Sequence, residues 1–393
     1  MTIVYILESL VPQGGTERII TEKANYFAEQ YKYDIYLVTC TQQQDQANAF
    51  PLSPSVKQIK LGIPYYSQYR YKYPKRLFVK LSLNRKLKKA VTAVVQQINP
   101  DILIGIGHYQ ADFVCSINCQ AKKIIECHET RQFTLREAGE KRSWLSRMST
   151  FLLRHHYFKA IEKKADAVVT LTEGDRKEWK RARQATVIPN FSTMSVSAFS
   201  NSTPKRIIAV GRLEWEKGYE RMIDIWENVS SRQPEWTLDI FGDGTQRDSL
   251  QTMIQQRGIK GIHLHHATNQ ISKEFANSSI CVLTSYFEGF SLVLLEALKH
   301  GVPCVAYDCP YGPASIIEDA QCGYLIEDGN AALFIEKLND LMQNDALRKA
   351  FSQNALERTK AFDTDVTMKK WKDLFENITC LSADYLPHRH NGQ

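Results

Sequence analysis

The sequence predicts an α/β fold made of two doubly wound domains, each with a parallel sheet. Short apolar runs rich in β-branched residues alternate with amphipathic stretches along the chain, the pattern of strands and helices in such sheets. The length of 393 residues is roughly two to three times that of a typical domain. A segment at 191–204 is rich in Ser, Thr, Asn and Pro without a clear period, and we expect it to link two domains at 1–190 and 205–362.

Each half of the chain is expected to supply its own sheet. The strand candidates of the first half are 2–8, 33–40, 55–61, 101–106, 122–127, 166–171 and 185–188. Its helix candidates lie near 16–30, 76–98, 110–119, 145–164 and 173–182. The strand candidates of the second half are 205–210, 236–241, 261–265, 280–284, 303–307 and 323–326, and residues 331–379 have the pattern of three successive helices.

The composition is that of a globular protein, with 43% hydrophobic and 24% charged residues, so disorder is not expected. The apolar opening, residues 1–10, has no basic leader and contains Glu8; we expect a first strand there and not a signal peptide. No apolar run approaches the ~20 residues that cross a bilayer. The nine cysteines lack a second pair at zinc-binding spacing and are expected to be reduced core thiols.

An apolar segment in the second half carries two carboxylates, Glu288 and Glu296. Ser291 is a favourable N-cap and Gly301 a favourable C′ residue, so a helix of about ten residues is expected between them. Glu288 then precedes the helix, and Glu296 lies roughly 7 Å along its axis from the start.

The start of this helix is expected to bind an anion, because its free amides and dipole are positive. The amides belong to Ser291, Leu292 and Val293. A diphosphate placed there would have one glutamate near each of its ends, and Glu296 could hold two ribose hydroxyls. The alternatives are a buried salt bridge from Glu296 to a nearby Lys or Arg, and a solvent-facing loop position for Glu288.

Two cations are expected at the carboxyl edge of the second sheet. A strand ends at Gly211-Arg212, and Lys217-Gly218 precedes the next helix. Arg212 and Lys217 suit a diphosphate. The alternative is a solvated charge cluster with Glu214 and Glu216.

A weaker signal, Gly14-Gly15, lies between the first strand and the first helix. Glycines there permit close approach to a phosphate or a sugar, although a tight turn explains them equally well. Neither half has GxGxxG after its first strand, which disfavours a dehydrogenase.

Together these stretches resemble the retaining GT-B glycosyltransferases of family four. The features follow the family order over most of the chain and are most specific in its C-terminal part. They are Pro12, Gly14-Gly15 and Arg18; His128 after a strand; Ile188-Pro189-Asn190; Val210-Gly211-Arg212 with Lys217-Gly218; and Glu288 to Ser291 with Glu296, followed by Gly301 and Pro303. The resemblance implies two Rossmann-like domains facing across a cleft and a final helix, within 363–393, that returns to the first domain through Trp371 and Phe375.

The resemblance also implies a role for each matched residue. Donor binding would involve Gly15, Arg212, Lys217, Glu288, Gly289, Phe290, Ser291, Leu292 and Glu296. Catalytic roles would fall to His128, Glu288, Arg212 and Lys217. Arg212 and Lys217 would hold the diphosphate, Glu296 the ribose, and Glu288 with the amides of Gly289 and Phe290 the transferred sugar.

No cofactor or metal is expected, because Arg and Lys can neutralise the leaving diphosphate as charge grows on it. Asp363 and Asp365 form the only DxD sequence, which is interpreted as the acidic start of the last helix. No protein nucleophile is obvious.

Charge is distributed unevenly and bears on the acceptor. Residues 1–190 contain 30 basic and 17 acidic residues, a net charge of +13, whereas residues 191–393 carry −6. Between Asp45 and Asp101 there are eleven basic residues, no acidic ones and several interleaved tyrosines. This segment suits an anionic membrane surface, and a second basic stretch, 131–164, lies in the same domain. A solvated helix face and a nucleic-acid patch are the alternatives.

The leading hypothesis is a hexosyltransferase-type enzyme that moves a sugar from a nucleotide-diphosphate donor to a lipid-linked or saccharide acceptor. We expect it to act in surface polysaccharide biosynthesis as a cytoplasmic protein, peripheral at the inner face of the membrane. The alternatives are a two-domain nucleotide-sugar epimerase and a non-catalytic nucleotide-sugar-binding protein.

Overall fold

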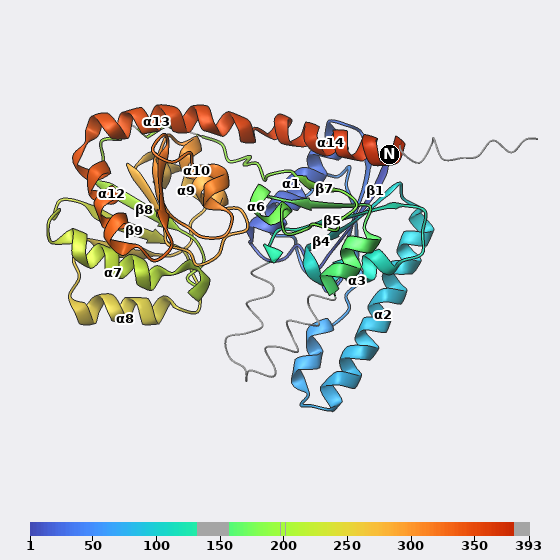
Figure 1. Cartoon of the computed structure of the whole chain (residues 1–393). Helices are drawn as coiled ribbons and strands as arrows, with labels where there is room; N and C mark the ends of the chain where they lie inside the picture. Colours follow the sequence, from blue (N-terminus) through green and yellow to red (C-terminus); the bar gives the residue numbers. More distant parts are fainter. Residues whose placement is uncertain (132–156, 197, 201, 381–393) are drawn as a thin grey trace, which may run out of the picture. The chain divides into compact units, whose positions relative to one another are not determined.

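The computed structural model describes residues 1–131, 157–196, 198–200 and 202–380, and the chain divides into two compact units (Figure 1). Within these ranges the first unit holds residues up to Leu171, Asp175–Ile188 and the chain from Thr367, and the second holds Thr172–Gly174 and Pro189–Val366. Each unit is built on its own parallel sheet, which confirms the predicted fold class. None of the helices in these ranges combines the length and the apolar character that a membrane span requires.

The first unit contains a seven-stranded sheet in the order β3-β2-β1-β4-β5-β6-β7. All seven predicted strands are present, within two residues of the expected bounds: β1 (Thr2–Leu7), β2 (Asp34–Thr39), β3 (Lys57–Lys60), β4 (Ile102–Ile106), β5 (Lys122–Glu126), β6 (Ala167–Thr170) and β7 (Ala185–Val187). The strand order reverses beside β1, so the segments after β1 and β4 leave the same edge next to one another. Doubly wound sheets bind ligands at this edge.

The helices that lie wholly or partly in the first unit follow the predicted order; α6 and α14 begin in residues of the second unit. They are α1 (Gly15–Glu29), η1 (Tyr65–Arg70), α2 (Lys75–Ile98), α3 (Gly107–Ser116), α6 (Glu173–Arg176) and α14 (Thr364–Cys380), with η for a 3-10 helix. Residues 157–164 are helical, and most of the candidate at 145–164 lies outside the described residues.

The predicted helix at 173–182 is wrong in length, because α6 ends at Arg176. Beyond it, the buried ring of Trp179 lies 5.5 Å from that of Phe158. Arg131 Nη1 donates to the Glu178 carbonyl at 2.7 Å. Tertiary contacts thus hold this segment in turns and override its helical periodicity.

The last helix, α14, packs against α1. The rings of Phe375 and Phe27 lie 5.2 Å apart, and Lys23 Nζ lies 4.0 Å from the centroid of the Trp371 ring. Trp371 and Phe375 are the two residues that the sequence singles out for this contact. The acidic start of the helix is also as expected, with Asp365 in its first turn.

Lys23 of α1 forms a buried ion pair with Glu126, the last residue of β5. Lys23 Nζ donates to Glu126 Oε1, and each side chain is only 1% exposed. Burial lowers the pKa of Lys23 against the opposing effect of Glu126. Burial also raises the pKa of Glu126, but Lys23 and His128 outweigh it and hold this pKa at about 2. The carboxylate is therefore ionised throughout the neutral range.

The second unit contains a six-stranded parallel sheet in the order β10-β9-β8-β11-β12-β13. The strands match the prediction within one residue: β8 (Arg206–Val210), β9 (Thr237–Phe241), β10 (Ile262–His265), β11 (Ile280–Leu283), β12 (Cys304–Asp308) and β13 (Gly323–Glu327). The helices are η2 (Trp215–Lys217), α7 (Tyr219–Ser230), α8 (Arg247–Arg257), α9 (Ile271–Ala276), α10 (Leu292–Lys299), α11 (Pro313–Ile316), α12 (Ala331–Gln343), α13 (Asp345–Thr359) and η3 (Lys360–Phe362). With α14, helices α12 and α13 account for the three predicted between 331 and 379.

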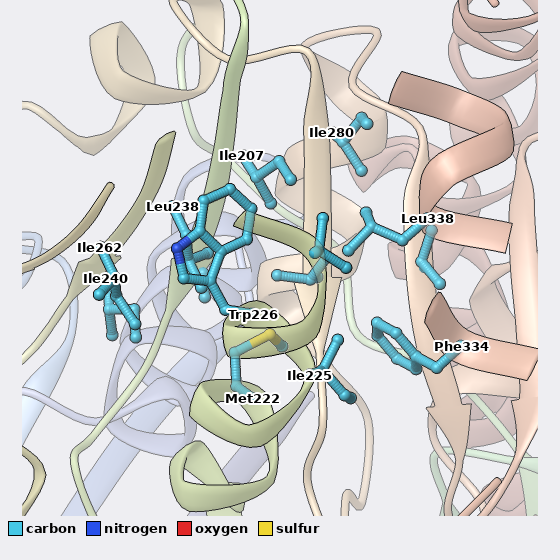
Figure 2. Close-up of a cluster of buried hydrophobic side chains, with 14 of the residues drawn as sticks. Ile207, Met222, Ile225, Trp226, Leu238, Ile240, Ile262, Ile280, Phe334 and Leu338 are labelled. Atoms are coloured by element: carbon cyan, nitrogen blue, oxygen red, sulfur yellow. The ribbon is translucent and has the colours of Figure 1, made fainter. Parts of the chain in front are cut away.

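The main core of the second unit lies between its sheet and helices α7 and α12. Figure 2 shows Trp226 of α7 among aliphatic side chains of the strands, with Phe334 and Leu338 of α12 beside them. The indole Nε1 of Trp226 donates to the Lys260 carbonyl at 3.0 Å, so the ring is buried without leaving a polar atom unpaired. Seven of the nine cysteines are buried in the two units and all nine thiols are free.

The described part of the segment 191–204 is hydrogen-bonded to the second unit. Lys299 Nζ donates to the Ser192 carbonyl at 2.5 Å, and Ser200 Oγ donates to the Ser278 carbonyl at 2.6 Å. The buried side chain of Arg348 donates through Nε to the Ser202 carbonyl at 3.2 Å. Its Nη1 also reaches the Leu341 and Met342 carbonyls at the end of α12.

Gly218 joins η2 to α7 in a conformation that requires glycine. Its φ is +61°, and a Cβ there would lie 2.4 Å from the Thr284 carbonyl oxygen. The Thr284 hydroxyl donates to the Gly218 carbonyl at 2.8 Å. This close backbone approach ties the loop after β8 to the loop after β11.

We expect Gly218→Ala to lower the free energy of unfolding by about 2 kcal/mol or more, because a left-handed conformation and a backbone clash add together. Gly258→Ala is the matched control: Gly258 has the same φ of +61°, but a Cβ there meets nothing within 4 Å. It should cost only about 1 kcal/mol. Chemical unfolding followed by tryptophan fluorescence measures both, and equal losses would contradict the close approach.

The buried ion pair predicts a defined acid sensitivity. The pKa of Glu126 is about 2 in the folded chain against an ordinary 4.5, so the unfolded chain binds more protons between these values. The resulting stability is complete above pH 4.5 and is lost as the pH falls toward 2, with about 2 kcal/mol gone at pH 3. The free energy of unfolding should therefore decrease more between pH 7 and pH 3 for the wild type than for Lys23→Met/Glu126→Gln. Equal falls would contradict a native carboxylate with so low a pKa.

Candidate functional site

The second unit brings several predicted residues to the start of α10. This helix runs over eight residues, Leu292–Lys299, after the N-cap residue Ser291, which has an extended backbone. Gly301 follows the C-terminal end with φ +70°, as expected of a C′ glycine. Ser291 is the N-cap residue that the sequence predicts, although its hydroxyl makes no cap hydrogen bond.

Glu288 is buried just before α10 and forms an ion pair with Lys217. Its Oε1 accepts from Lys217 Nζ at 2.7 Å and from Ser285 Oγ at 2.8 Å. The residue is 8% exposed, so the alternative of a solvent-facing loop glutamate is wrong. The Tyr311 amide donates to the Glu288 carbonyl at 3.2 Å. Hydrogen bonds at both its backbone and its side chain thus hold Glu288 in place.

The two predicted cations behave differently. Lys217, the last residue of η2, has a side chain 21% exposed and held against Glu288. Arg212, directly after β8, is 72% exposed and pairs with Glu216 at 2.8 Å. For Arg212 the predicted alternative of a solvated pair with Glu216 is what the structure shows, and Glu214 instead accepts from Thr245. Arg212 is therefore free to change partners at low cost, whereas Lys217 is not.

The remaining donor-binding candidates follow Glu288 along the chain. Phe290 is 7% exposed and its ring lies 5.8 Å from Phe362, so only its backbone is suited to a ligand. Leu292 begins α10, and Glu296 lies in its middle with 5% exposure. Its backbone carbonyl accepts from His300 Nδ1 at 2.7 Å. Glu296 is thus a buried carboxylate on the helix whose start Glu288 adjoins, as the sequence predicts.

The first unit places its two candidates at the carboxyl edge of its own sheet. Gly15 is the exposed first residue of α1, in the connection that follows β1. His128 follows β5, and its Nε2 lies 3.0 Å from Glu126 Oε1. The side chain of His128 is 6% exposed.

Sequence reasoning missed the partners of His128. Lys23 and Glu126 are separated by 103 residues along the chain, so no local spacing connects them. A signal was present for each: Lys23 lies on the apolar face of α1, four residues before Phe27, and Glu126 follows two isoleucines at a strand end. Charges at such positions are rarely buried without a partner.

Most of the second unit is similar to a known family. Residues 191–358 match the family described as Glycosyl transferases group 1. The chain is 32% identical over 221 residues to the amylovoran biosynthesis glycosyltransferase AmsD of Erwinia amylovora, covering 53% of this chain and 62% of that one. It is 34% identical over 227 residues to the exopolysaccharide phosphotransferase SCO2592 of Streptomyces coelicolor, covering 56% and 24%. An uncharacterized glycosyltransferase of Haemophilus influenzae is 24% identical over 383 residues, covering 94% and 98%.

Solved structures share the fold over nearly all of the chain. A complex of an S. aureus TarM variant with fondaparinux, α-GlcNAc-glycerol and UDP has a TM-score of 0.75 at 18% identity, covering 95% of this chain and 99% of that one. The sucrose-phosphate synthase of Thermosynechococcus elongatus has a TM-score of 0.79 at 17% identity, covering 97% and 99%. Residues 191–358 thus match the glycosyl transferases group 1 model, in a chain that has the GT-B fold.

Proposed function

We propose that this protein is a retaining glycosyltransferase that moves a sugar from a nucleoside-diphosphate sugar to a lipid-linked or saccharide acceptor. The observation that carries the proposal is the ion pair between Lys217 and the buried Glu288 near the start of α10, inside the part of the chain that matches the glycosyl transferases group 1 model. The name of AmsD, a relative in amylovoran biosynthesis, supports a role in surface polysaccharide assembly. The UDP complex of TarM supports a nucleoside diphosphate as the leaving group.

The arrangement of charges suits the departure of a diphosphate. As the anomeric bond breaks, negative charge grows on the diphosphate, and a cation and helix amides already in position stabilise it without reorganisation. Lys217 is such a cation, because Glu288 holds it. Arg212, exposed and paired with Glu216, would turn to the phosphates. With two such cations the reaction needs no metal ion.

The other residues have complementary roles in this proposal. Glu288, with the amides of Gly289 and Phe290, binds hydroxyls of the transferred sugar, and Glu296 binds the ribose. Ser291 and Leu292 contribute their amides to the diphosphate. In the first unit, Gly15 permits close approach of a phosphate, and His128 stabilises the reacting sugar.

We expect Lys217→Ala to lower kcat/KM for sugar transfer by about a hundredfold or more, the usual scale for losing one group that stabilises developing charge. It should also remove most of the stabilisation that UDP gives against thermal unfolding, about 2.7 kcal/mol at a hundred times its dissociation constant. Lys205→Ala is the matched control, because Lys205 makes an exposed pair with Glu235 before β8.

The experiment screens nucleoside-diphosphate sugars by thermal shift and then follows nucleotide release with and without a polyprenyl-linked saccharide. The proposal requires acceptor-dependent release, a product with the anomeric configuration of the donor, and turnover that persists in EDTA. Sugar interconversion without acceptor would favour an epimerase, binding without turnover a non-catalytic protein, and an equal effect of Lys205→Ala would remove Lys217 from the site.

We also propose that the enzyme acts as a peripheral protein at the inner, cytoplasmic face of the membrane. In Figure 1 the N-terminal half of α2 and η1 project from the sheet of the first unit, and Val91 and Val95, both near the C-terminal end of α2, are its only buried residues. We call residues 65–86 the basic tip. Its exposed aromatic and aliphatic side chains are Tyr66, Tyr69, Tyr71, Tyr73, Leu77, Phe78 and Leu81.

The basic tip combines these apolar groups with cations alone. It contains seven basic and no acidic residues. Two of its cations lie over its own tyrosines: Arg76 Cζ is 4.2 Å from the centroid of the Tyr69 ring, and Lys75 Nζ is 4.5 Å from that of the Tyr71 ring. Aromatic and cationic groups on one projecting element suit the headgroup region of an anionic bilayer, where each cation contributes about 1 kcal/mol. A second copy of the same tip would be repelled.

We expect Tyr73→Ser/Phe78→Ser to weaken binding to vesicles containing phosphatidylserine by about tenfold or more, since two large apolar side chains leave the interface. Tyr73 and Phe78 are 82% and 68% exposed, and Phe199→Ser is the control, because Phe199 is 62% exposed in the second unit. Sedimentation with anionic and with neutral vesicles measures the difference. Binding that ignores lipid charge, or that Phe199→Ser weakens as much, would contradict the tip as the membrane surface.

A further inference from the structure

A buried chain of polar contacts leads to His128 from the interior of the first unit. Lys23 of α1 pairs with Glu126 of β5, and the same Glu126 oxygen, Oε1, accepts from His128 Nε2 at 3.0 Å. All three side chains are at most 6% exposed. The other carboxylate oxygen, Oε2, is buried and has no hydrogen-bond partner within the described residues. The contacts of Glu126 are therefore concentrated on one oxygen.

The charge of Glu126 decides which nitrogen of His128 carries the proton. Lys23 and His128 hold the pKa of Glu126 at about 2 although burial raises it, so the carboxylate is ionised at neutral pH. An ionised carboxylate only accepts hydrogen bonds, and the nitrogen that faces it must therefore carry a hydrogen. In the neutral imidazole the proton is on Nε2. The lone pair is then on Nδ1, which has no hydrogen-bond partner among the described residues.

Lys23 is itself fixed on several sides. Its ammonium lies 4.0 Å from the centroid of the Trp371 ring in α14 and 5.5 Å from that of Tyr5 in β1. Aromatic rings on two sides attract the cation, and Glu126 supplies its ionic partner. A lysine held this way fixes the position of the carboxylate, because moving either group would leave a buried charge unpaired.

We propose that Glu126 is a positioning residue for His128 in glycosyl transfer, with Lys23 holding Glu126 in its ionised form. Glu126 fixes the orientation and tautomer of the imidazole, so that Nδ1 is the atom offered to the sugar. The inference deepens the proposed function and rests on the role given there to His128.

A second buried ion pair, which affects only the fold, is the control for this proposal. The same unit contains a second buried pair, Arg131 Nη1 with Glu162 Oε1 at 2.9 Å, with side chains 7% and 3% exposed. No contact joins this pair to His128 among the described residues. Loss of its carboxylate charge therefore reports the effect of a buried pair on the fold alone.

The test compares two double variants that differ only in whether an acceptor faces His128. Lys23→Met/Glu126→Gln keeps a carbonyl oxygen there, and Lys23→Met/Glu126→Leu removes it. Both lack the two charges, and neutral replacement of a buried pair usually preserves folding. Nitrogen-15 NMR of the histidine ring gives the tautomer, and steady-state kinetics with the donor found by screening gives kcat and KM.

We expect the Gln variant to keep the proton on Nε2 and the Leu variant to lose that preference. The kcat of the Leu variant should be about tenfold or more below that of the Gln variant, as for other residues that orient a reacting imidazole, with similar KM. Glu162→Gln should leave the tautomer as in the wild type.

Several results would overturn the inference. One is that His128 keeps the wild-type tautomer in the Leu variant. Another is that the tautomer changes in the Leu variant but kcat is the same in both double variants. A change of tautomer in Glu162→Gln would show a general effect of the fold. Absence of sugar transfer by the wild type would refute the proposed function, and with it the role in catalysis, while the NMR comparison would still decide whether Glu126 orients His128.

Discussion

Buried carboxylates that require a cation organise both units of this protein. Glu126 and Glu288 each lie at or beyond the carboxyl end of a parallel strand, and each is paired with a lysine. Lys23 comes from the middle of α1, and Lys217 from the end of η2. A carboxylate with so little exposure would be costly to ionise alone. The lysine makes ionisation favourable and in turn is immobilised by it. The polar residues at the sheet edges are thereby held in place.

The two ion pairs differ in how much of the lysine side chain is exposed to solvent. Lys23 and Glu126 are each 1% exposed, whereas Lys217 is 21% exposed beside Glu288. The first pair can therefore only act through a neighbour, and His128 is that neighbour. The second keeps a cation accessible to an anionic ligand. A buried carboxylate paired with a lysine thus positions His128 in the first unit and keeps Lys217 accessible in the second.

The strands and most helices could be predicted from the sequence because strands of a doubly wound sheet are covered on both faces and form continuous apolar runs. The burial of Glu296 was predictable for the same reason, since leucines surround it on α10. The burial of Glu288 was not predictable, because this residue lies in a loop without periodicity. It is held inside by hydrogen bonds to Lys217, Ser285 and Tyr311. The pair Lys23–Glu126 was missed because its members meet only through the fold. The helix expected beyond Arg176 failed because packing of Trp179 outweighed local propensity.

The attachment of segment 191–204 determines where the second unit can be separated from the first. Arg348 and Lys299 use carbonyls of Ser202 and Ser192 as acceptors, and the arginine also caps the end of α12. A fragment that starts at Arg206, the first residue of β8, would leave the buried guanidinium of Arg348 without the Ser202 carbonyl as an acceptor. A fragment designed for expression or for fusion to another module should therefore start no later than Pro189, and exchange of this stretch for an unrelated flexible spacer would weaken the helical layer it braces.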